Sequence, residues 1–76
     1  MHNVRMKVDQ QVLRIVAEVL GVHAEDVDVD LPLRDWGQVC RINDETCMVL
    51  NINIGTQLAS QCRTVGDYLR LVRSAA

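Results

Sequence analysis

The sequence predicts a small all-α domain, and three observations support this prediction. The chain has 76 residues, of which 49% are hydrophobic, and this is enough for one domain (residues 1–76) with a single core. Apolar residues recur at helical spacing over residues 8–20. They do so again over residues 65–72, directly after a threonine suited to start a helix. We therefore expect three main helices and a short fourth one, with a long first loop.

The first expected helix has the clearest pattern. Its apolar positions follow the i, i+4, i+7, i+8 spacing of a single buried face: Val8, Val12, Ile15, Val16, Val19 and Leu20. Gly21 follows the last apolar pair, where helices often end on a residue in the left-handed conformation.

A long loop, GVHAEDVDVDLPLRDWG (residues 21–37), comes next and is called the acidic loop below. It holds five of the ten acidic residues of the chain: Glu25, Asp26, Asp28, Asp30 and Asp35. This charge is typical of a solvated loop, and it also suits a docking surface for a basic partner. We expect five apolar residues to pin the loop to the core: Val22, Val27, Val29, Leu31 and Leu33.

The last expected helix starts at a recognisable cap. Thr64 is a favourable N-cap residue, and Asp67 stands three positions later, as in a capping box. Val65, Leu69 and Val72 form the apolar face, with Tyr68 beside it.

The centre of the chain, residues 38–61, is ambiguous by local pattern. LNINI (residues 50–54) alternates strictly, which indicates a strand, and residues 43–45 could turn a hairpin. A helix over the same region has a usable but untidy apolar face. The flanking helices favour a helical centre, and an α+β domain with a central hairpin is the lesser alternative.

Composition excludes several classes of function. The net charge of −2 argues against a nucleic-acid binder, which normally shows a basic face. The chain has no apolar run long enough for a membrane span, and we expect no signal peptide. Three cysteines suit a reduced, cytoplasmic protein, and we expect no metal site and a monomer. No set of catalytic residues is recognisable, so we do not expect an enzyme.

The order of these features resembles the acyl carrier protein family. VLRIVAEVLGVHAEDVDVDLPLRDWG (residues 12–37) is similar to that family's first helix and first loop, and RTVGDYLRLV (residues 63–72) to its last helix. The resemblance implies an acyl-carrier-like bundle of three or four helices. It also implies a role in fatty-acid, polyketide or nonribosomal-peptide biosynthesis.

The family's attachment motif, G-x-D-S-L, opens the second helix, and its serine carries a 4'-phosphopantetheine arm. Counted from Gly37, the serine position is taken by Cys40, between Val39 and Arg41. Thr46 follows two acidic residues, but its use would need a six-residue shift of the motif, and Ser60 and Ser74 lie outside the context of the motif. A thiol at a helix N-terminus favours the reactive thiolate, although a lone cysteine is more often an inert, buried residue.

The resemblance implies a docking surface at the acidic loop and the start of the second helix. Its expected residues are Asp35, Trp36, Val39, Arg41, Glu45 and Met48. Two of them have competing interpretations, because Trp36 is expected mainly to close the loop on the bundle, and Met48 mainly to pack in the core. The predicted interior consists of Val12, Ile15, Val16, Val19, Leu20, Val27, Leu31, Leu50, Ile54, Leu58, Val65, Leu69 and Val72.

Two functions follow. The favoured one is a carrier-like protein that lacks the attachment serine, holds no cofactor, and acts by docking to synthase or acyl-transfer enzymes. The alternative is a working carrier that tethers acyl thioesters on phosphopantetheine. That alternative requires unusual chemistry at Cys40, or a natural form with serine at this position.

Overall fold

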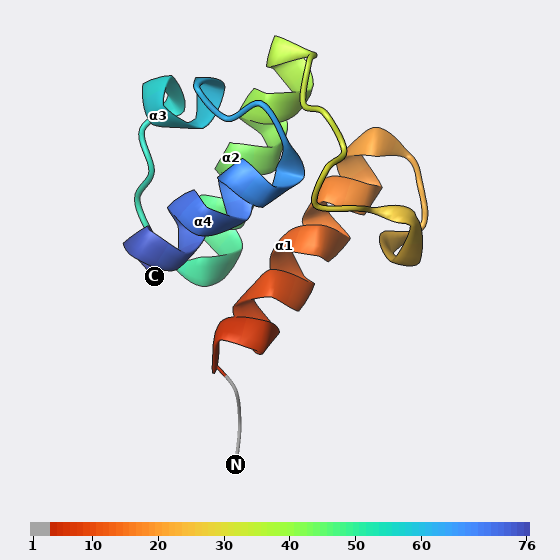
Figure 1. Cartoon of the computed structure of the whole chain (residues 1–76). Coiled ribbons are helices and arrows are strands. Elements are labelled where there is room, and N and C mark those ends of the chain that lie inside the picture. The colour runs from red at the N-terminus through yellow and green to blue at the C-terminus, as the bar shows by residue number, and fades with distance from the viewer. Residues whose placement is uncertain (1–3) are drawn as a thin grey trace.

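Four α-helices, joined by one long loop and two short connections, make up the part of the chain that a computed structural model describes (Figure 1). This part is residues 4–76, with side chains described from residue 7 onward. Within it there is no strand, and the fold is all-α as predicted. The elements are α1 (Val4–Leu20), the 3-10 helix η1 (Ala24–Asp26), α2 (Trp36–Leu50), α3 (Thr56–Ser60) and α4 (Val65–Ala75).

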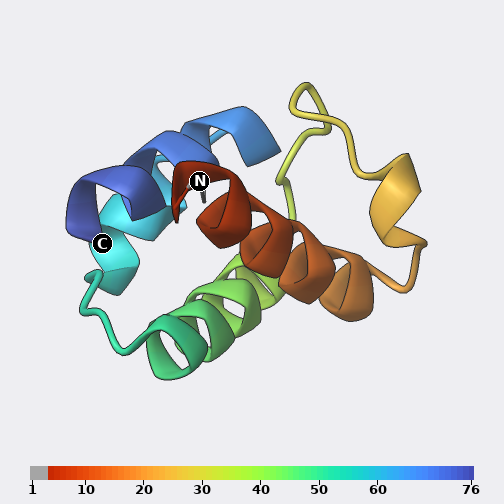
Figure 2. The same cartoon turned by 90° about the horizontal axis from the view of Figure 1, so that it is seen from below.

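Helix α1 contacts both α2 and α4, and the short α3 contacts α2. Seen from below in Figure 2, α2 runs along one edge of the bundle. The predicted apolar face of α1 is confirmed: Val12 and Val16 are fully buried, and Ile15 is nearly so. Gly21 has a φ of 73°, the left-handed conformation expected after the last apolar pair.

The acidic loop is fastened to the start of α4 by backbone hydrogen bonds. Gly66 N donates to the Val29 carbonyl at 2.8 Å, and Val65 N donates to the Leu31 carbonyl at 3.0 Å. Leu33 N donates to the Arg63 carbonyl at 2.8 Å. The first amides of a helix have no partner inside the helix, and here two of them are satisfied by the loop.

Only part of the apolar side of this loop reaches the core. Val27 is buried, and Leu31 and Leu33 are partly buried against the core. Val22 and Val29 are about half exposed, at 45% and 52%, so the prediction that they pin the loop was wrong. Val29 holds its place through its backbone carbonyl, not its side chain.

The ambiguous centre of the chain is helical. Helix α2 starts after Asp35, whose side chain accepts a hydrogen bond from Gln38 N at 3.0 Å. It ends at Leu50, because Asn51 adopts the left-handed conformation with a φ of 55°. The alternation in LNINI belongs to the extended connection to α3, where Ile52 and Ile54 turn inward and Asn53 outward. This alternation is that of a strand, but no partner strand lies within residues 4–76.

The last two helices match their predictions. The short α3 falls between residues 55 and 63 as expected. Thr64 caps α4 in a capping box: its side chain accepts from Asp67 N at 3.2 Å, and Asp67 Oδ2 accepts from Thr64 N at 3.2 Å. Arg73 Nε donates to Asp9 Oδ1 at 3.0 Å and ties α4 to α1.

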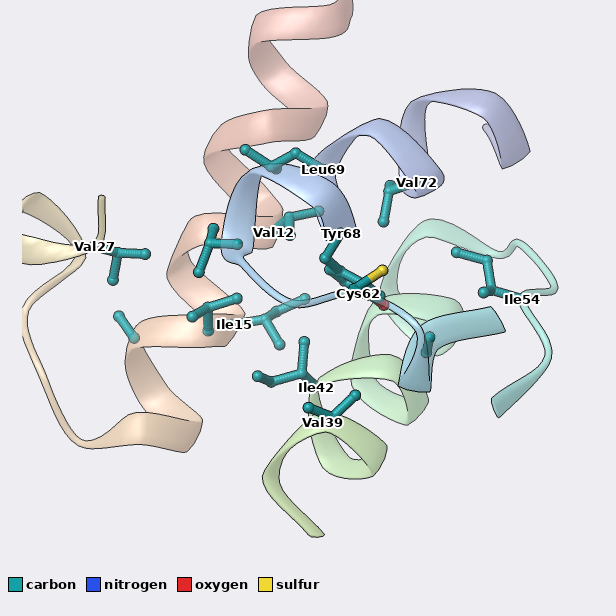
Figure 3. Close-up of a cluster of buried hydrophobic side chains, with 14 residues drawn as sticks. Val12, Ile15, Val27, Val39, Ile42, Ile54, Cys62, Tyr68, Leu69 and Val72 are labelled. Atoms are coloured by element: carbon teal, nitrogen blue, oxygen red, sulfur yellow. The ribbon is translucent and has the colours of Figure 1, made fainter. Parts of the chain in front are cut away.

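The core gathers aliphatic side chains from all four helices around Tyr68 (Figure 3). Most of the predicted interior is buried or partly buried, but Leu58 is 53% exposed and that prediction was wrong. Its neighbour Ala59 points inward in its place. Six core residues are outside the predicted interior: Ala17, Val39, Ile42, Ala59, Cys62 and Tyr68.

Candidate functional site

The start of α2, where the acidic loop ends, is the candidate site. Asp35 is exposed and caps the helix, so its carboxylate is engaged by the Gln38 amide. Trp36 is the first residue of α2 and is 56% exposed. The expectation that the indole closes the loop on the bundle is therefore wrong. The acidic loop thus ends on a capping carboxylate, Asp35, that is followed directly by a largely exposed indole, Trp36.

Cys40 lies one turn further along α2 and is half-buried. It is the fifth residue of the helix and lies beyond the first turn, so the assumption that Cys40 stands at a helix N-terminus is wrong. Cys47 and Cys62 are also free thiols. Burial raises the pKa of the Cys62 thiol, and the nearby charge of Asp67 adds to this, so Cys62 is kept in its unreactive form.

The other expected docking residues divide between surface and core. Arg41 is exposed, Glu45 is half-buried, and Met48 is 76% exposed, so the core interpretation of Met48 is wrong. Val39 is 5% exposed and contacts the core, so it cannot contribute to a surface. Asp35, at the start of α2, and four residues within the helix are thus at least partly exposed: Trp36, Arg41, Glu45 and Met48.

The acidic loop presents its charge to solvent. Its five acidic residues are all exposed. Asp28 accepts a hydrogen bond from Asp30 N at 3.3 Å, which shapes the turn between them. The ion pairs found among residues 7–76 are Asp67 with Arg70 and Asp9 with Arg73, and neither involves the loop. The loop is therefore a fixed, negatively charged surface, held in place by its contacts with α4.

A buried polar cluster between α2 and α4 was not predicted from the sequence. Tyr68 donates its hydroxyl proton to Asn43 Oδ1 at 2.8 Å, and Asn43 Nδ2 donates to the Ile54 carbonyl at 2.9 Å. These bonds join α4, α2 and the connection before α3. Burial raises the pKa of Tyr68 to about 12, so the phenol remains a hydrogen-bond donor at ordinary pH.

Thr46 belongs to the same buried region. It is 0% exposed, and its hydroxyl has no hydrogen-bond partner within the described part of the chain. A modifying enzyme cannot reach this oxygen without unfolding α2. The helical spacing of Val39, Ile42, Asn43 and Thr46 would have revealed the buried face of α2, but two of the four are polar.

The described residues offer few other sites. No group of three or more metal-binding side chains comes together between residues 7 and 76. No helix of residues 4–76 has the length and apolar character that crossing a membrane requires. A shallow depression between α1 and η1, lined by Leu13, Arg14 and Glu25 among others, lies away from the start of α2.

Comparison with known proteins does not assign the chain. No protein family model, no curated protein and no solved structure matches it.

Proposed function

We propose that the protein is an acyl-carrier-like protein that carries no phosphopantetheine arm and acts by docking to synthase or acyl-transfer enzymes. The order of its helices, with a long loop after the first and a short helix before the last, supports this proposal. The observation that carries it is the start of α2. There a capping aspartate is followed by an exposed tryptophan, where α2 begins.

Two positions compete for the place of that serine. Counting from Gly37 selects Cys40, but Cys40 lies inside the helix. The family's motif opens its second helix, and the residue that follows the capping Asp35 and opens α2 is Trp36. Neither an indole nor a half-buried thiol offers the hydroxyl that the arm requires.

The docking surface in this proposal consists of the acidic loop, the exposed residues Asp35, Trp36, Arg41 and Met48, and the half-buried Glu45. An exposed aromatic side chain beside exposed acids suits a partner that presents an apolar pocket with a basic rim. Exposed charges are screened over about 8–10 Å at near-physiological ionic strength. Binding through the acidic loop should therefore weaken as salt rises.

The test is intact-protein mass spectrometry after incubation with coenzyme A and a broad-specificity phosphopantetheinyl transferase. The natural chain is compared with Trp36→Ser and Cys40→Ser. We expect no change in the mass of the natural chain. A gain on Trp36→Ser alone would place the lost site where α2 starts, and a gain on Cys40→Ser alone would place it by spacing from Gly37.

A mass gain of one arm on the natural chain would overturn the proposal and make the protein a working carrier. If neither variant is modified, the carrier frame itself is in question. In that case binding of the natural chain to the transferase, measured by calorimetry, decides whether docking survives. Lack of binding at low salt would refute the docking role.

A further inference from the structure

The outer face of α2 carries an exposed stripe that the core does not use. Gly37, Arg41, Asp44 and Met48 recur at spacings of four, three and four residues, so they lie on one side of the helix. All four are exposed, and Met48, at 76%, is the most exposed of the large hydrophobic residues described. In Figure 2 α2 runs along the edge of the bundle, and no other element of residues 4–76 covers its outer side.

This stripe is complementary to itself. If a second α2 lies antiparallel against it, related by a two-fold axis at the middle of the stripe, residues equally far from the middle face each other. Arg41 then faces Asp44 of the second copy, and Gly37 faces Met48 of the second copy. Every contact occurs twice, so two ion pairs form at the centre and two methionines pack at the ends.

The chemistry of each pair suits close approach. Helices pack with their axes about 8–10 Å apart, and a glycine leaves room for a long side chain from the facing helix. The flexible Met48 side chain can fill this space. Glu45 follows Arg41 by four residues and so lies next to it on the surface of α2. In the dimer, Glu45 adds a second acid near the Arg41 of the other copy.

We propose that the outer face of α2 binds the same face of a second copy of this chain, giving a weak symmetric dimer in place of the monomer expected from the sequence. The partner is identified by charge: the one arginine of the stripe meets an aspartate at the position that the two-fold axis requires. The inference does not depend on the carrier-like role. Because Arg41, Glu45 and Met48 also belong to the proposed docking surface, the dimer would compete with an enzyme partner.

The expected affinity is low. A single pair of helices buries less surface than the roughly 1,200–2,000 Å² of stable complexes. We therefore expect a dissociation constant on the order of 100 µM. Such a dimer is visible by sedimentation equilibrium, or by NMR diffusion, over a concentration series of the natural chain.

The decisive test exchanges the charges. In Arg41→Asp, two ion pairs become two pairs of like charges, so we expect dimerisation at least about tenfold weaker. In the double variant Arg41→Asp with Asp44→Arg the pairs form again in reverse, and we expect the dissociation constant to return close to that of the natural chain. Far-UV circular dichroism confirms that each variant remains helical.

Arg34→Asp is the matched control, because it makes the same change in net charge at an exposed position of the acidic loop, two residues before α2 begins and outside the stripe. We expect it to leave dimerisation nearly unchanged. A natural chain that stays monomeric up to about 1 mM, ten times the expected dissociation constant, would overturn the proposal. The proposal would also be overturned if Arg41→Asp weakened dimerisation no more than Arg34→Asp does. A folded double variant that remains monomeric would overturn it as well.

Discussion

Thr46 is the residue whose replacement tests the buried region most directly. Its hydroxyl is buried without a partner, and burying an unpaired hydroxyl costs about 1–3 kcal/mol in proteins. Valine has nearly the same shape and a similar helix propensity, but no hydroxyl. We expect Thr46→Val to raise the free energy of unfolding by about 1 kcal/mol, the lower end of that range.

The assay is urea unfolding followed by far-UV circular dichroism, with thermal unfolding as a second measurement. For a domain of this size a gain of about 1 kcal/mol corresponds to a rise in Tm of about 4–8 °C. Thr46→Ser is the matched control, because it keeps the hydroxyl and removes the methyl group. We expect it to lose about 1 kcal/mol through lost apolar burial.

A clear loss of stability in Thr46→Val would refute the reasoning, because it would show that the hydroxyl has a partner. The phenol of Tyr68 lies beside Thr46, and its proton is donated to Asn43, so its oxygen remains able to accept from the Thr46 hydroxyl. A double-mutant cycle of Thr46→Val with Tyr68→Phe measures any coupling between the two side chains. No coupling is expected if the Thr46 hydroxyl is unpaired.

Three further predictions concern stability and pH. Burial raises the pKa of Tyr68 from 10 to about 12 in the folded protein, so the free energy of unfolding should fall by up to roughly 3 kcal/mol as pH rises from about 10 to 12. Urea unfolding of Tyr68→Phe should lack this pH dependence. The same alkaline profile for the natural chain and Tyr68→Phe would contradict the prediction. Backbone amide hydrogen bonds from Arg63 and Thr64 lower the pKa of Asp67 in the folded protein, so the carboxylate stabilises the fold above its unfolded pKa and this effect is lost as pH falls from there through the folded pKa. The difference in free energy of unfolding between the natural chain and Asp67→Asn should therefore shrink in acid. A constant difference would count against the capping box. A Cβ atom at position 66 would lie 3.1 Å from the Val29 carbonyl oxygen, so Gly66→Ala should lower the free energy of unfolding by about 1 kcal/mol, despite alanine's better helix propensity. It should also speed hydrogen exchange of the amide at position 66. Equal or greater stability would show that the loop moves to make room for the methyl group.

Local sequence patterns predicted the ends of the chain well. The apolar face of α1, the left-handed Gly21 and the capping box at Thr64 depend on contacts within a few residues, and each is present. The class of the fold followed from these helices. Local pattern could not predict the centre, because the alternation of Ile52 and Ile54 is equally typical of a strand and of an extended connection over a core.

The candidate site was predicted only in part. Arg41, Glu45 and Met48 lie along α2 on the side away from the core or at its margin, but Val39 is buried and Cys40 lies inside the helix instead of at its start. The start of α2 depends on Asp35 capping the helix, and several nearby residues could have served as a start by spacing alone. A shift of a few residues along a helix rotates each side chain to another face, so the position of the cap decides what is exposed.

The sequence by itself determined the first helix, the acidic loop after it and the capped last helix, because helix periodicity and capping act over short distances. Tertiary structure alone decided which side of α2 is buried. The carbonyl of Ile54 and the phenol of Tyr68 satisfy Asn43 there, so a polar residue can occupy the core. The same packing leaves Trp36 and Met48 in solvent, because the aliphatic core is already filled from the four helices.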